Sequence, residues 1–169
     1  MLNFDAMTLG NHEFDDGISG LVPFLKNQTV PFVVSNIDIT HTPSLANLYT
    51  PSIIRKVRPT SPPLAFSSSQ VGGRKVGIIG YLTPETLEVS NPGKLIINDE
   101  LEAVAAEAER LHAAGVDIII GLGHSGYQKD MELAMAIPHL DVLVGGHTHS
   151  FLYSGEGNPS NNIIEVKRF

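Results

Sequence analysis

Three short turns in the sequence carry side chains that could bind metal ions or move protons. Each follows an apolar run, and together they read "LGNHEFD" (9–15), "GLGHSGY" (121–127) and "VGGHTHS" (144–150). Imidazole nitrogens and an amide oxygen are donors that suit Zn²⁺, Mn²⁺ or a similar ion. These residue types predict a mixed nitrogen and oxygen metal site, with four candidate ligands: Asn11, His124, His147 and His149.

The first turn also carries residues that could act on a substrate. Asn11 and His12 are adjacent, so their side chains diverge, and one can face a metal ion while the other reaches the substrate. Asp15 lies three residues further on, where it could orient His12. Two ions roughly 3.5–4 Å apart can clamp a phosphate and activate water. We therefore predict that Asn11 and His12 face a phosphate group, and that the charge of Asp15 keeps His12 protonated. Glu13 and Asp16 are expected to be surface or capping residues.

Apolar runs predict the strands that must hold these turns. They cover residues 4–10, 30–36, 74–82, 116–123 and 141–146. The last three are apolar throughout, as expected for strands buried on both faces. The stretch from 41 to 73 is rich in Pro, Ser and Thr, and we expect extended connections or edge strands there.

Helical patterns lie between the strands. From 99 to 114 an apolar stripe recurs at helical spacing, with Asp99 and Glu102 resembling a capping box and Gly115 as the stop. Further helices are expected at 17–26 and at 128–137, the latter ending before Pro138. Strands that alternate with helices indicate an α/β fold, in which the carboxyl ends of the strands meet at one ligand-binding edge. The three turns should therefore lie together.

Composition limits the classes of function. The 169 residues are 42% hydrophobic and 17% charged, which describes one globular domain. A net charge of −7 argues against a nucleic-acid polymer or an anionic membrane as partner. There is no cysteine, and no apolar run reaches the roughly 18 residues of a transmembrane helix. The first ten residues lack the pattern of a signal peptide.

A dinucleotide-binding loop is the competing interpretation of the second turn. Gly121, Gly123 and Gly126 match GxGxxG, follow an apolar strand and precede a helix. However, the acid that should contact the ribose belongs at the far end of the next strand, whereas Asp141 opens that strand. This interpretation also leaves the other two histidine turns without a role, so we disfavour it.

The motifs taken together resemble a known family. "GNHEFD", "GHSG" and "GGHTH", within the longer segments "DAMTLGNHEFDDG", "VGIIGYLTPET", "SNPG" and "DVLVGGHTHSFLYSG", resemble the calcineurin-like metallophosphoesterases, specifically the 5′-nucleotidase and apyrase family. The resemblance covers about residues 4–155. It implies an α/β fold, a four-layer αββα sandwich, followed in the family by a C-terminal domain that binds the nucleoside.

The resemblance also implies roles for individual residues. Asn11, His124 and His147 look like ligands of one ion, and His149 like a ligand of a second. His12 looks like the histidine that stabilises the transition state and leaving group, with Asp15 as its partner. The implied cofactors are two divalent ions, zinc in most members, with Mn, Mg or Co as alternatives. The implied substrate is a small-molecule nucleotide, and the implied location of the full-length parent is extracellular or on the cell surface.

The sequence departs from the family pattern at both ends. The Asp-x-His and Gly-Asp motifs that precede "DAM" in the family are absent, as is the C-terminal domain. We therefore expect a partial metallophosphoesterase domain at 1–155, incomplete at its N-terminus, and a linker-like tail at 156–169. The expected function is hydrolysis of nucleoside 5′-phosphates, active only with the upstream motifs. The alternative is an inactive, truncated chain with a partial metal site. Apyrase or UDP-sugar hydrolase specificity, and the oligomeric state, stay open.

Overall fold

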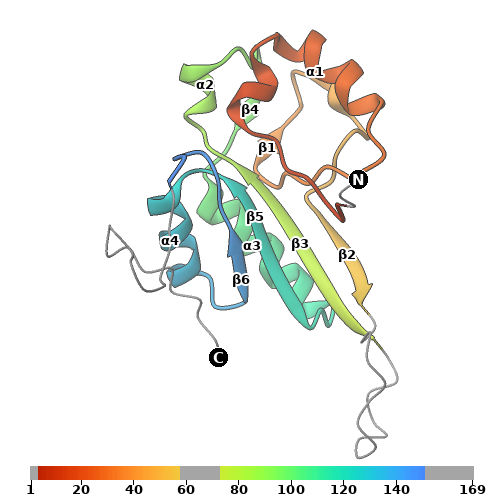
Figure 1. The fold of residues 1–169 in the computed structure, drawn as a ribbon, viewed down its shortest axis with the longest axis vertical. Helices are drawn as coiled ribbons and strands as arrows, with labels where there is room; N and C mark the ends of the chain where they lie inside the picture. The colour runs from red at the N-terminus through yellow and green to blue at the C-terminus, as the bar shows by residue number, and fades with distance from the viewer. Residues whose placement is uncertain (1–3, 58–72, 151–169) are drawn as a thin grey trace, which may run out of the picture.

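The computed structural model describes residues 4–57 and 73–150 (Figure 1). The predicted tail at 156–169, with its boundary at residue 155, lies outside these ranges. The helical elements are η1 (Asn11–Phe14), α1 (Gly17–Lys26), η2 (Pro43–Leu45), α2 (Thr86–Val89), α3 (Glu100–Ala113) and α4 (Tyr127–Ala136), where η marks a 3₁₀ helix. The strands are β1 (Ile37–Asp38), β2 (Ser52–Val57), β3 (Arg74–Leu82), β4 (Ile96–Ile97), β5 (Ile118–His124) and β6 (Val142–Val144).

The larger sheet has the strand order β2-β3-β5-β6 (Figure 1). β3 pairs in parallel with β5, and β5 with β6, whereas β2 runs antiparallel to β3. The strands predicted at 74–82, 116–123 and 141–146 therefore exist as β3, β5 and a shorter β6. β2 is an edge strand within the stretch from 41 to 73, as expected. The register sets Leu82 opposite His124, so β3 and β5 end together.

The strands predicted at 4–10 and 30–36 were wrong. These segments form only isolated bridges, from Met7 to Phe32 and from Val33 to Thr50. The reason lies in the partners of the second segment. The backbone N–H groups of its successive residues donate to different neighbours: Val33 to Met7, Val34 to Thr50 and Ser35 to Gly80. No single neighbour accompanies the segment long enough to make a continuous ladder.

Burial of β6 on both faces was also a wrong prediction. Val142 is 42% exposed and Val144 is 49% exposed, whereas Leu143 between them packs against a core cluster. Among the described residues β6 is the edge strand of the sheet. Only one face of β6 is therefore buried, although its sequence is apolar throughout.

The helices agree closely with the sequence pattern. α1 has the predicted bounds, and α4 begins one residue earlier than expected and ends before Pro138. The Asp99 side chain caps α3 by accepting from the N–H groups of Leu101 (2.9 Å) and Glu102 (3.2 Å). Gly115 follows this helix with φ +72°, a left-handed conformation that glycine adopts without strain. Among the described residues, no helix has the length and hydropathy needed to span a membrane.

Two core clusters lie on opposite faces of β3. One packs around α3 and α4 and contains Ile79 and Tyr81. The other packs around η1, α1 and the β1-β4 pair and contains Leu82. The faces alternate because successive strand residues point to opposite sides. The backbone of Val33 packs directly against β3 at Gly80, because a Cβ on Gly80 would lie 1.8 Å from the Val33 carbonyl oxygen.

Candidate active site

The structure brings the first two histidine turns together. His124 is the last residue of β5, and Asn11 opens η1, 113 residues earlier. The His124 Nε2 atom lies 3.0 Å from the Asn11 Oδ1 atom. This approach depends on glycine on both sides of the imidazole. A Cβ at Gly10 would lie 2.8 Å from His124 Cε1, and one at Gly146 would lie 3.2 Å from His124 Nδ1. The small residues around the ring are therefore a structural requirement of the site.

The third turn brings His147 to the same place. The rings of His124 and His147 have centroids 5.1 Å apart and are tilted by 59°. His147 has φ +81° and His149 has φ +52°. A residue other than glycine pays about 1–2 kcal/mol for a left-handed backbone. Strain of this kind persists where surrounding structure holds it and clusters at functional sites. Two such residues in one short turn support the prediction that these histidines have a function.

His12 and Asp15 form the predicted pair at the mouth of the site. Their side chains are 72% and 52% exposed, and His12 Nδ1 lies 2.8 Å from Asp15 Oδ2. Ser90 donates its hydroxyl hydrogen to the other carboxylate oxygen at 2.7 Å. The hydrogen bonds from His12 and then Ser90 hold the pKa of Asp15 below its usual value. Asp15 is therefore an anion that orients the largely exposed imidazole of His12 through its Nδ1 atom.

The electrostatics of His124 favour a neutral ring. Burial is the main cause that lowers its pKa, and the neighbouring His147 lowers it further. Smaller contributions come from Glu13, which raises the pKa, and from His12 and His149, which lower it. Neutral imidazole is the form that binds a metal ion, so this environment prepares His124 for that role.

The predicted ligands are partly assembled among the described residues. Asn11, His124 and His147 converge, and the exposed His149 lies two residues beyond His147. Two imidazoles and an amide oxygen, held in a glycine-lined cradle, are a donor set that fits a divalent ion. Over the ranges that the structure describes, however, no group of three His, Cys, Asp or Glu side chains could hold a metal by itself. Glu13 is a capping residue, because its carboxylate accepts from the Gly10 N–H at 2.6 Å.

Three residues of this region were missed by the sequence reasoning. Glu85 contacts His147, Ser90 contacts Asp15, and the fully buried Asn36 holds the end of β3. The Asn36 amide donates to the carbonyls of Leu82 (2.7 Å) and Asn98 (2.9 Å), and its oxygen accepts from the Leu82 N–H. None of these residues stands in a chemical motif. Only the family-like segments "LTPET" and "SNPG" point to Glu85 and Ser90.

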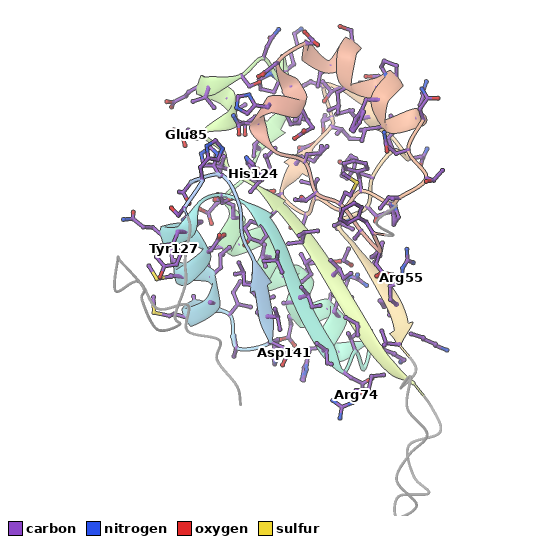
Figure 2. The ribbon with its side chains drawn as sticks, in the orientation of Figure 1. Arg55, Arg74, Glu85, His124, Tyr127 and Asp141 are labelled. Atoms are coloured by element: carbon purple, nitrogen blue, oxygen red, sulfur yellow. The ribbon has the colours of Figure 1, made fainter. Side chains whose placement is uncertain are left out.

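The dinucleotide interpretation fails on the geometry of the second turn. A Cβ at Gly123 would lie 1.9 Å from the ring of Tyr81, which is fully buried. The glycine therefore makes room for an aromatic side chain rather than for a pyrophosphate. Asp141 accepts from the Ile119 N–H at the start of β5, and Figure 2 places it at the end of the sheet opposite His124. Asp141 is thus not positioned for a ribose at this turn.

Comparison with known proteins identifies the family. The model of the calcineurin-like phosphoesterases matches residues 2–151. The chain belongs to the calcineurin-like phosphoesterase family. The fold predicted from the motifs is therefore confirmed as a metallophosphoesterase fold, and the family implies divalent metal ions.

Among the similar proteins are an apyrase and several 5′-nucleotidases. An apyrase of Tabanus yao is 43% identical over 166 residues, covering 97% of this chain and 27% of its own length. A snake venom 5′-nucleotidase of Naja atra is 43% identical over 164 residues, covering 96% and 28%. The crystal structure of a 5′-nucleotidase precursor from Thermus thermophilus superposes with a TM-score of 0.78 at 38% identity, covering 90% of this phosphoesterase chain and 28% of that protein. The chain thus spans about a quarter of the length of the relatives it matches.

Proposed function

We propose that this chain is the metal-binding part of a hydrolase that releases inorganic phosphate from nucleoside 5′-phosphates. The observation that carries the proposal is the convergence of Asn11, His124 and His147 beside the hydrogen-bonded pair His12–Asp15. A metal site and an oriented, solvent-facing imidazole are together what phosphate-ester hydrolysis requires. The relatives named as 5′-nucleotidases and an apyrase support a nucleotide as the ester.

Asn11, His124 and His147 would hold one divalent ion, and His149 would contribute to a second. When bound, such ions polarise the phosphate oxygens and supply a water nucleophile at neutral pH. We propose zinc as the natural metal, with Mn²⁺, Mg²⁺ and Co²⁺ as alternatives, because imidazole donors dominate the set.

His12 acts on the leaving group in this proposal. Attack of the water oxygen on phosphorus breaks the bond to the 5′ oxygen, and that oxygen leaves as the alcohol of a nucleoside after taking up a proton. Asp15 accepts the hydrogen bond from Nδ1–H of His12. The other ring nitrogen, Nε2, is therefore the atom that delivers the proton to the 5′ oxygen or stabilises its charge. The 72% exposure of the His12 side chain leaves it accessible to a substrate.

The test uses a chimera, because the chain spans about a quarter of its relatives. Residues 4–150 replace the matching segment of the Thermus thermophilus enzyme, and phosphate release from AMP, ADP and a UDP-sugar is measured. His12→Ala should lower release by at least roughly 100-fold, the scale of a lost general acid, and Asn11→Ala should lower it as well, because a proposed metal ligand is removed. His112→Ala is the matched control, because that histidine lies at the end of α3, before β5 begins. A folded chimera without phosphate release, or with release untouched by both site variants, would contradict the proposal.

The second candidate is a chain that binds metal without hydrolytic activity of its own. Among the described residues, the lack of a self-sufficient group of three His, Cys, Asp or Glu ligands favours it for the isolated 169-residue product. Zinc titration of that product distinguishes the two. One weak site per chain and no phosphate release support the second candidate, whereas two tight sites and release of phosphate from AMP refute it.

We further propose that the parent molecule acts outside the cell. The support is the similarity to a venom enzyme. An antibody against the chain should detect the parent in the medium or on the surface of intact source cells, and detection only after lysis would contradict this location.

A further inference from the structure

Glu85 is a carboxylate outside the predicted ligand set that nevertheless touches it. Its Oε2 atom lies 3.1 Å from Nε2 of His147. Figure 2 shows Glu85 and His124 at the same edge of the sheet. The side chain of His147 is 22% exposed and that of Glu85 is 54% exposed, so the contact lies at the rim of the site rather than in the core.

The turn that carries Glu85 is fixed to the strand that carries His124. Between β3 and α2, the Thr83 N–H donates to the backbone carbonyl of His124 at 3.1 Å. The Thr83 hydroxyl oxygen then accepts from the Glu85 N–H at 3.2 Å. The backbone of Glu85 is therefore held relative to the end of β5, and its carboxylate occupies a defined position beside the third turn.

The contact selects one of the two ring nitrogens of His147. A metal-binding histidine commonly donates the hydrogen of its second ring nitrogen to a carboxylate, which fixes the tautomer and the orientation of the ring. With Nε2–H donated to Glu85, the lone pair of His147 is on Nδ1. His124 is arranged differently, since its Nε2 faces Asn11 Oδ1.

We propose that Glu85 is a positioning residue that presents His147 to the metal ion through Nδ1. This inference rests on the proposed function, because it takes His147 to be a ligand. The left-handed backbone of His147 explains why its ring benefits from the contact with Glu85. A ring attached to a strained turn needs an external partner to stay in one orientation, and among the described residues Glu85 supplies such a hydrogen bond.

The experiment measures metal affinity of the metal-free chain, with Zn²⁺ in competition with a chelating dye. Glu85→Gln should weaken Zn²⁺ binding about 10–100-fold, the usual effect of removing an outer carboxylate partner. Glu88→Gln is the matched control, because Glu88 is an exposed glutamate three residues further along the same segment. The Glu88→Gln variant should bind Zn²⁺ with the same affinity as the unchanged chain. Far-UV circular dichroism of each metal-free variant checks that the fold is retained.

A second readout separates positioning from direct ligation. The visible spectrum of the Co²⁺-loaded chain reports the number and type of ligands. Under the proposal, Glu85→Gln keeps the coordination number of the unchanged chain but binds Co²⁺ more weakly. A spectrum showing one ligand fewer would identify Glu85 as a ligand and overturn the positioning role.

The possible failures are distinguishable. If Asn11→Ala and His147→Ala weaken Zn²⁺ binding but Glu85→Gln does not, the Glu85 inference is wrong and the metal centre stands. If none of the three variants changes binding, the assignment of the metal centre itself is wrong.

Discussion

Replacing Gly123 by alanine should strongly destabilise the fold, although the position lies in a strand where alanine is ordinarily tolerated. The new Cβ would lie 1.9 Å from Cζ, 2.0 Å from Cε2 and 2.3 Å from the hydroxyl oxygen of Tyr81. The ring is fully buried, and its hydroxyl donates to Asp130 Oδ1 at 2.8 Å. It cannot move aside without disturbing that bond and the packing around it.

The magnitude follows from the two disturbances. Overpacking a filled core costs about 1–3 kcal/mol. Separating the Tyr81 hydroxyl from its buried partner costs about 1–3 kcal/mol more. Removing a glycine from a strand returns about 0.5–1 kcal/mol. The net loss in the free energy of unfolding is therefore about 1–5 kcal/mol, set against the roughly 5–15 kcal/mol of a typical domain.

Gly121 provides the matched control on the same face of the same strand. A Cβ there meets Leu143 and Tyr81 at 3.5 Å and Leu140 at 3.7 Å, which are ordinary contacts. Gly121→Ala should leave stability unchanged or raise it by about 0.5–1 kcal/mol.

Thermal unfolding followed by far-UV circular dichroism is the assay, because the chain contains no tryptophan. Gly123→Ala should lower the Tm by about 2–20 °C relative to the unchanged chain, using roughly 2–4 °C per kcal/mol for a domain of this size. Equal unfolding midpoints for the two variants would refute the packing argument. Tyr81→Phe in the Gly123→Ala background should cost less than the sum of the single changes, because both disturb the same hydroxyl.

Three further predictions concern the supports of the site. Asn36→Ala should lower the free energy of unfolding by about 2–4 kcal/mol in urea melts, because the buried backbone N–H and C=O of Leu82 and the partly buried C=O of Asn98 lose their partner; a loss below that range would mean that water replaces it. Asp130 is buried and its pKa is raised by desolvation, so its folded form binds a proton more tightly than the unfolded chain does. Its contribution to stability is therefore greatest below the unfolded pKa of 3.8 and declines as pH rises through the raised folded value. In urea melts, the free energy of unfolding of Asp130→Asn should rise relative to that of the unchanged chain over this pH range. A difference that stays constant with pH would contradict the shift. Ser90→Ala should raise the pKa of Asp15 toward its ordinary value, because one of the two hydrogen bonds that lower it is removed; a carboxyl ¹³C NMR titration measures this, and an unmoved midpoint would mean that His12 alone sets it.

The sequence by itself determined the local elements and the chemistry of the turns. The apolar stripe, the Asp99 cap and Gly115 were sufficient to place α3, because helix bonds and caps join residues close in sequence. The uninterrupted apolar runs placed β3 and β5, because a short run of apolar residues is typical of a strand buried on both faces. The donor types in the three turns indicated a metal site, and the order of the motifs indicated the family that the comparisons show.

Tertiary structure alone decided which neighbours each segment has. The segment from 30 to 36 looks like a strand, yet its successive N–H groups donate to three different partners, so no ladder forms. β6 looks like a buried strand but has an exposed face, because its burial depends on what packs beside it. Glu85 and Ser90 stand in no chemical motif, because their roles arise from contacts with residues 62 and 75 positions away along the chain. A sequence pattern records a residue's chemistry, whereas the meeting of His147 with Glu85 is a property of the folded chain.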